Sequence, residues 1–167
     1  KIPEGVKIAV IGDIHEHEYQ FDQMLRRLNP SDSMLIVSVG DIFDKGFGQD
    51  QAESICNKLK ILSEKKQAYM IQGNHELKVI KKALKQNKLS PILEWCRKLP
   101  LSLFFEFSNG TKLTIVHGGV LPHHTIDDLT HNVEICYVRS IDERGKMIRM
   151  IWEKRGDKNI LKSEKSG

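Results

Sequence analysis

The sequence predicts a single α/β domain in which a largely parallel central sheet is followed by a second, antiparallel or mixed sheet. Up to about residue 98, apolar runs typical of strands alternate with segments whose apolar residues recur at helical spacing. Two further strand-like segments then follow one another directly, with turn residues between them. The length of 167 residues suits one domain.

Alternating strands and helices account for the first part of the chain. Strands are predicted at Val6–Ile11, Met34–Val39 and Ala68–Ile71. The unbroken apolar run of the second is typical of a strand buried on both faces. Helical periodicity predicts four helices, at Tyr19–Leu28, Gln49–Leu62, Glu76–Gln86 and Pro91–Lys98. This β-α-β-α-β-α order favours parallel strands joined by helical crossovers.

The second sheet is predicted from a hairpin signature. Leu101–Phe107 and Lys112–Val116 flank a turn that contains Asn109-Gly110, so we expect them to pair and to pack on the first unit. Farther along the chain the pattern weakens. Val133–Ser140 fits either a helix or a strand, and from Lys154 onward the chain is polar and Lys-rich, with no expected core element.

Composition excludes several functional classes. No run approaches the roughly 18 to 20 apolar residues of a membrane span, and the first residues do not form a signal-peptide pattern. Three widely spaced cysteines without a CxxC pair favour buried, reduced thiols and a cytoplasmic setting. The net charge of +4 is too small, and too poorly interleaved with aromatics, to predict nucleic-acid binding. It would help to attract phosphorylated substrates.

Metal-binding side chains follow four of the predicted strands. Ligands of open α/β sheets bind beyond the carboxyl ends of the strands, so these side chains are expected to converge. Carboxylates, a carboxamide and imidazoles without a thiolate suit Mn²⁺, Fe, Zn²⁺ or Mg²⁺. The four segments are Gly12-Asp13-Ile14-His15, Gly40-Asp41-Ile42-Phe43-Asp44, Gly73-Asn74-His75-Glu76 and His117-Gly118-Gly119.

Two metal ions about 3.5 to 4 Å apart require a bridging carboxylate, and the middle loop offers Asp41 for this role. Asp13 and His15 would complete the protein ligands of one metal, and Asn74 and His117 would bind the other. A water molecule shared by two cations loses a proton near neutral pH, which supplies a hydroxide nucleophile.

Other residues of these loops suit proton transfer and phosphate binding. His75 could protonate a leaving alkoxide, and Asp44 could hold its imidazole oriented and charged. Lys45 offers a cation for a phosphoryl oxygen. Two alternatives remain open: Asp44 could be a turn residue, and Glu76 could either support the site or simply begin a helix.

The four motifs, in this order, resemble the calcineurin-like metallophosphoesterase superfamily over Ile8 to about Pro122. The strongest likeness is to its phosphoprotein phosphatase branch, which includes bacterial serine/threonine phosphatases and diadenosine tetraphosphate hydrolases. The resemblance implies a two-metal phosphoesterase with a β-sandwich flanked by helices. It also implies His75 as general acid, Asp44 as its partner, and five metal ligands: Asp13, His15, Asp41, Asn74 and His117.

Three departures from the family pattern are visible. Glu16 stands where the family usually has Gly, and Lys45 stands where it usually has Arg, which replaces a bidentate fork by a point charge. The family also supplies a metal-binding His from a late Gly-His loop, whereas no histidine follows His131 here. His123 and His124 follow the fourth motif too closely for that part. We therefore expect residues 1–167 to form one catalytic domain that lacks its closing C-terminal strands.

The function predicted from these residues is metal-dependent hydrolysis of phosphomonoesters such as phosphoserine or phosphothreonine. The expected reaction is attack of a dimetal-bridging hydroxide on phosphorus, with Mn²⁺ as the most effective metal in vitro. The same site could cleave a dinucleoside polyphosphate or another phosphodiester. A hypothesis from another class is a metal-binding module that binds a partner without catalysis.

Overall fold

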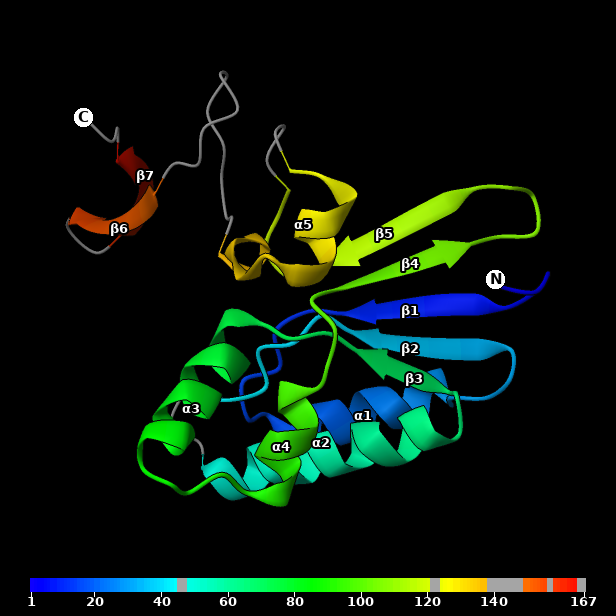
Figure 1. Ribbon diagram of the computed structural model, residues 1–167, viewed down its shortest axis with the longest axis horizontal. Coiled ribbons are helices and arrows are strands. Elements are labelled where there is room, and N and C mark those ends of the chain that lie inside the picture. The colour runs from blue at the N-terminus through cyan, green and yellow to red at the C-terminus, as the bar shows by residue number, and fades with distance from the viewer. Residues whose placement is uncertain (45–47, 121–123, 138–148, 156–157, 165–167) are drawn as a thin grey trace.

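A three-stranded parallel sheet forms the centre of the molecule (Figure 1). The computed structural model describes residues 1–44, 48–120, 124–137, 149–155 and 158–164. Strands β1 (Lys7–Ile11), β2 (Met34–Ser38) and β3 (Ala68–Met70) lie in the order β1-β2-β3, and both pairs are parallel. This confirms the predicted parallel sheet and places the carboxyl ends of its strands at one edge.

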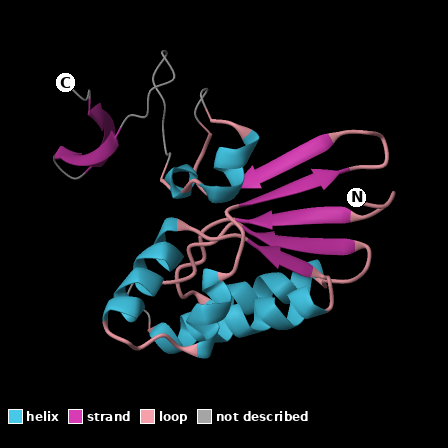
Figure 2. Cartoon of the chain, in the orientation of Figure 1, coloured by secondary structure: helices cyan, strands magenta, loops and turns pink. Residues whose placement is uncertain are grey.

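Helices cover one face of this sheet (Figure 2). The helices are α1 (Glu18–Leu28), α2 (Gln49–Glu64), α3 (Asn74–Lys85) and α4 (Pro91–Arg97). Phe21, Ile55, Leu59 and Leu93 project from three of them into a core that includes Ile36 of β2. Helix α3 begins beside the carboxyl ends of the strands, two residues earlier than its periodicity predicts.

The other face of the sheet is covered by an antiparallel pair, β4 (Ser102–Glu106) and β5 (Lys112–Val116). Phe105 and Ile115 from this pair form a second core with Val37 and Ile71. Ile36 and Val37, neighbours in β2, are both fully buried in different cores, which confirms that this strand is covered on both faces. The two-sheet arrangement flanked by helices is the predicted one.

The chain after β5 fits the prediction only in part. It forms a short helix α5 (Ile126–His131), which the sequence did not predict. A 3-10 helix η1 (Val133–Cys136) fits the helical alternative for Val133–Ser140, of which residues 138–140 lie outside the described part. Strands β6 (Arg149–Arg155) and β7 (Lys158–Glu164) form an antiparallel pair where no core element is expected.

Cysteine burial agrees with the sequence interpretation. Cys56, Cys96 and Cys136 are all buried and form no disulfide, as expected for small core residues. Among the described residues, no helix is both long enough and apolar enough to cross a membrane.

Candidate metal centre

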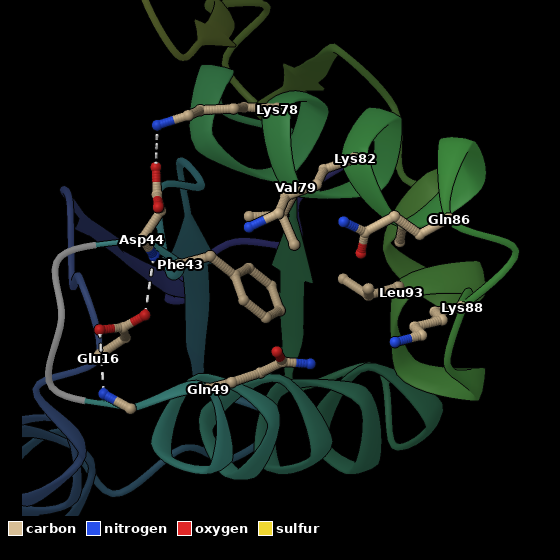
Figure 3. Close-up of a pocket in the computed structure, with 12 residues that line it drawn as sticks. Glu16, Phe43, Asp44, Gln49, Lys78, Val79, Lys82, Gln86, Lys88 and Leu93 are labelled. Atoms are coloured by element: carbon tan, nitrogen blue, oxygen red, sulfur yellow. Dashed lines mark hydrogen bonds and ion pairs between the residues drawn. The ribbon is translucent and has the colours of Figure 1, made fainter.

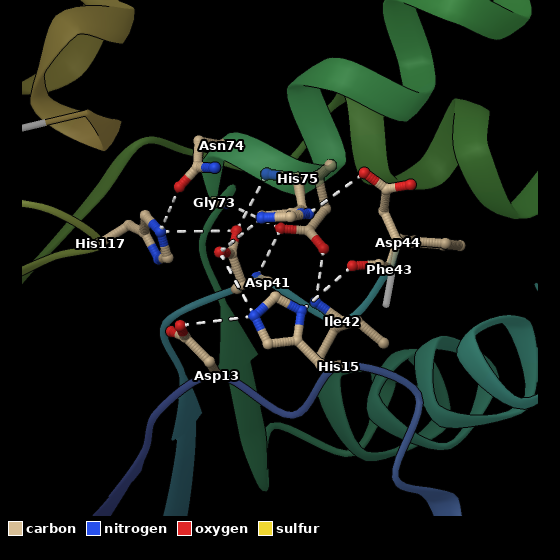
Figure 4. A network of polar contacts seen from close by, with 12 residues as sticks. Asp13, His15, Asp41, Ile42, Phe43, Asp44, Gly73, Asn74, His75 and His117 are labelled. Carbon is tan, nitrogen blue, oxygen red and sulfur yellow. Dashed lines mark hydrogen bonds and ion pairs between the residues drawn. The ribbon is translucent and has the colours of Figure 1, made fainter. Parts of the chain in front are cut away.

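The loops that follow β1, β2, β3 and β5 meet around the carboxylate of Asp41 (Figure 4). Side chains from all four sequence motifs lie in this cluster, and among the predicted site residues only Lys45 lies outside the described chain. The Asp41 side chain is 2% exposed, so the centre of the cluster is shielded from solvent.

Glycine at two strand exits permits the close approach of these loops. A Cβ atom at Gly40, where φ is +93°, would lie 2.4 Å from the backbone nitrogen of Gly73. A Cβ atom at Gly73 would lie 2.2 Å from Oδ1 of Asp41. The loops after β2 and β3 therefore touch backbone to backbone, which only glycine allows at these positions.

A buried carboxylate holds the same two loops together. Glu76 is fully buried and accepts hydrogen bonds from the backbone nitrogens of Asp41 at 2.7 Å, Ile42 at 2.7 Å and Gly73 at 2.8 Å. Burial raises the pKa of Glu76 above its ordinary value, although the three N–H groups act in the opposite direction. Glu76 thus caps the start of α3 and also supports the site. The sequence had left these two roles open as alternatives, and Glu76 has both.

Three imidazoles surround the Asp41 carboxylate. Nε2 of His117 lies 3.4 Å from Oδ1, and Nε2 atoms of His75 and His15 lie 3.7 and 3.9 Å from Oδ2. The backbone nitrogen of His75 also donates to Oδ1 at 2.9 Å. Burial alone would raise the pKa of Asp41, but its hydrogen bonds with His117 and His75 bring the pKa below its ordinary value. The carboxylate is therefore ionised at neutral pH.

Backbone carbonyls fix the orientation of two of these rings. Nδ1 of His15 lies 3.2 Å from the carbonyl of Phe43, and Nδ1 of His117 lies 2.8 Å from the carbonyl of Val39. Because a carbonyl oxygen can only accept, Nδ1 carries the proton in both rings. Nε2 of each ring faces Asp41 and is the atom available to a metal, the usual arrangement of metal-binding histidines.

His117 also contacts the amide of Asn74, with 3.0 Å between Nε2 and Oδ1. Burial would lower the pKa of His117, but its contacts with Asp41 raise it above its ordinary value. Without a metal, a proton on Nε2 would satisfy both Asn74 and Asp41. A cation bound between these oxygens and Nε2 would replace that proton.

Two groups of possible ligands share Asp41. One contains His15 and His75, and the other contains Asp13 and His117; in each, the ligand atoms lie within 4.8 Å of one another. Asp13 also lies 3.6 Å from Nε2 of His15, so the prediction that these two residues bind the same metal stays compatible with the geometry, although the two groups place them apart. Its side chain is 54% exposed, so the cluster opens to solvent on this side.

Asp44 links His75 to a lysine that the sequence analysis missed. Oδ2 of Asp44 lies 3.4 Å from Nδ1 of His75 and also pairs with Nζ of Lys78. The hydrogen bond from Lys78 holds the pKa of Asp44 below its ordinary value. Lys78 stands three residues after His75 on α3, and this helical spacing was the available signal.

Glu16 has a role that its position in the first motif did not reveal. Its buried carboxylate accepts hydrogen bonds from the backbone nitrogens of Asp44 at 2.8 Å and Gly48 at 3.3 Å (Figure 3). These two residues flank the segment that contains Lys45. Glu16 therefore faces the loop after β2 and supports the position of Asp44.

A family model described as calcineurin-like phosphoesterase matches residues 6–165. The chain belongs to the calcineurin-like phosphoesterase family. This family depends on two metal ions, and the donors gathered here fit such a centre. An ionised, buried carboxylate lies between two groups of oxygen and imidazole ligands, and a cation would supply the counter-charge that its burial requires.

Solved structures of similar fold agree with this family. One is a candidate diadenosine tetraphosphatase with 21% identity and a TM-score of 0.65, and the match covers 96% of this chain and 65% of that one. Another is a serine/threonine phosphatase from Saccharomyces cerevisiae with similarity to human phosphatase PP5. It has 24% identity and a TM-score of 0.56, and the match covers 76% of this chain and 43% of that one. The chain thus spans less than two thirds of either.

Proposed function

We propose that this chain hydrolyses phosphomonoesters of the phosphoserine and phosphothreonine class at a two-metal centre. The observation that carries the proposal is the buried Asp41 carboxylate shared by two ligand groups. In the proposed site two metal ions would be held by Asp41, which both ligand groups share, together with Asp13, His15, Asn74 and His117. When bound, the metal ions supply Lewis-acid stabilisation of the phosphoryl group and lower the pKa of water. Mn²⁺ is the metal we expect to support the highest activity in vitro.

His75 is the proposed general acid. Its Nε2 faces the centre beside Asp41, where a leaving oxygen would lie within reach, and its Nδ1 contacts Asp44. The negative charge of Asp44 stabilises the protonated imidazole, and Lys78 keeps Asp44 ionised. Proton donation at Nε2 would neutralise the alkoxide as the phosphorus–oxygen bond breaks. In this proposal Lys45 contributes a positive charge near the phosphoryl oxygens.

A second candidate substrate is a dinucleoside polyphosphate. The structure of the candidate diadenosine tetraphosphatase matches nearly the whole of this chain, which supports testing that compound beside a monoester. Both substrates would use the same ligands and the same proton donor. They differ in the leaving group, which is an alcohol in one case and a nucleotide in the other.

The test is turnover of p-nitrophenyl phosphate and diadenosine tetraphosphate with and without added Mn²⁺, with bound metal measured in parallel. We expect Mn²⁺-dependent release of p-nitrophenol, and loss of both metal and activity in Asp41→Asn. The matched control is Asp50→Asn, which changes an exposed Asp on α2. Bound metal without turnover of either compound would contradict the enzymatic proposal and would favour a metal-dependent binding module.

A further inference from the structure

A cavity of about 570 Å³ adjoins the metal centre on the side of Asp44 (Figure 3). The segment Phe43–Asp44 belongs to both: the Phe43 carbonyl contacts His15, and its ring faces the cavity. Apolar side chains of α3 and α4, namely Val79, Ala83 and Leu93, complete the cavity wall. The cavity therefore borders the loop that carries Asp44, which contacts the proposed proton donor His75.

This cavity is lined by three lysines and two carboxylates, which leaves it with a net positive charge. Lys78, Lys82 and Lys88 line it together with the amides of Gln49 and Gln86. Lys78 and Lys82 stand one helical turn apart on α3, a rise of about 6 Å, so the positive charges continue away from the metal centre. In Figure 3, Lys82 and Lys88 extend toward the cavity from different ends of this wall.

The carboxylates that line the cavity already have other partners. Glu16 accepts from the backbone nitrogens of Asp44 and Gly48, and Asp44 pairs with Lys78 and contacts His75. Within the described part of the chain, neither Lys82 nor Lys88 forms an ion pair with a carboxylate. Both side chains are exposed, so these two ammonium groups are available to an anion that enters the cavity.

We propose that this cavity binds a second phosphate group, carried by the leaving-group side of the substrate, through Lys82 and Lys88. The inference rests on the proposed hydrolysis at the metal centre and deepens it. It implies that the substrate is a phosphate ester or anhydride with at least one further phosphate. A divalent anion suits this site better than a single carboxylate, because two lysines and two amides surround the cavity.

The test is calorimetric binding of tripolyphosphate to the full chain freed of metal on a chelating resin, in about 0.15 M salt to screen diffuse attraction. The variant is Lys82→Gln with Lys88→Gln. The matched control is Lys81→Gln with Lys85→Gln, which removes the same charge from lysines that line only a neighbouring groove. We expect affinity to fall about tenfold in the first and by less than about twofold in the control.

Equal losses in the two variants, or no loss in either, would overturn the inference, because binding would then depend on overall charge or on another site. A peptide with two phosphoserines, compared with its singly phosphorylated form, tests whether the second phosphate can come from a neighbouring residue. A loss of affinity in the Lys82→Gln, Lys88→Gln variant but not in the control, with tripolyphosphate or with the doubly phosphorylated peptide, supports the proposed phosphate site. Since binding is measured without metal or turnover, failure of catalysis at the metal centre would be seen separately.

Discussion

The two halves of the site differ in how their carboxylates are held. Asp41 is 2% exposed and its loop is fixed by the buried Glu76, whereas Asp44 is 37% exposed and contacts a surface lysine. The buried half brings together groups that a metal must find already in place. The exposed half places its charge where substrate and solvent can reach it. The comparison shows that the loop holding Asp41 and Asp44 has two kinds of support, one buried and one exposed, and the proposed metal binding and proton transfer would depend on different ones.

The largest effect is expected from His75, which connects the two halves. His75→Asn should lower turnover of p-nitrophenyl phosphate by about a hundredfold or more, because it removes the proposed proton donor. Bound metal, measured by atomic emission, should stay near the wild-type value. Loss of metal in this variant would instead make His75 a ligand, in line with its place beside His15 and Asp41.

Glu76→Gln tests the support of the buried half. The amide replaces one acceptor oxygen by an NH₂ group among three backbone donors, so we expect the free energy of unfolding to fall by about 3 kcal/mol. Urea denaturation measures this loss, and Mn²⁺ affinity should fall with it. Glu64→Gln, at an exposed position of α2, is the control. Equal stability of the two variants would mean that Glu76 does not hold the loops.

The buried half should also make metal binding sensitive to acid. Its contacts with Asp41 raise the pKa of His117 above its ordinary value of about 6.5, and a metal must displace the proton on Nε2. Mn²⁺ affinity should therefore begin to fall while the pH is still above about 6.5, at up to about tenfold per pH unit. The measurement is a series of Mn²⁺ binding isotherms between about pH 8.5 and about pH 5.5, a range that spans the ordinary pKa of histidine. A constant affinity across this range would contradict the prediction.

In the metal-free protein, the raised pKa of His117 should make the fold more stable at lower pH, whereas metal binding weakens there. Because the folded pKa of His117 is raised, the stability from its contact with Asp41 is fully present below the unfolded pKa. This stabilisation is lost as the pH rises through the pKa that His117 has in the folded protein. Unfolding of the metal-free chain at several pH values would show this trend, and added Mn²⁺ should reverse it.

The smallest effect is expected from Glu16→Gln in the exposed half. The variant weakens the hydrogen bonds to Asp44 and Gly48, so the free energy of unfolding should fall by about 1 kcal/mol. Turnover should fall several-fold while Mn²⁺ affinity stays unchanged, because the Asp41 loop keeps Glu76. If Glu16→Gln lost as much metal affinity as Glu76→Gln, the two halves of the site would not be supported separately.

Strands and motifs were predictable where local sequence and tertiary burial agree. The apolar run of Met34–Val39 identified β2 to within one residue because both faces of that strand are covered. The early start of α3 at Asn74 was missed, since the capping contact between Gly73 and Glu76 extends the helix by two residues that carry no apolar periodicity. The β6–β7 pair was missed because lysines and polar residues interrupt its alternation.

Within the site, the identities of the clustered residues were predictable but their supports were not. The four motifs named the side chains around Asp41 because each ends a strand. Apart from the local contact of Glu76 with Gly73, Glu16 and Glu76 accept from backbone groups 28 to 35 positions away, and nothing local in the sequence specifies those distant partners. Lys78 was missed because it looked like one more charge on a solvated helix face.

Helix α3 carries Asn74 and His75 in its first turn and Lys78 and Lys82 in the turns that follow. A single helix therefore sets the separation between the proposed proton donor His75 and Lys82, about 10 Å along the axis for seven residues. Two anions with equal total charge would then be distinguished by the spacing of their phosphates. An insertion of one residue between His75 and Lys82 would rotate the lysine by about 100° and remove this discrimination, while the loops that hold Asp41 stayed unchanged.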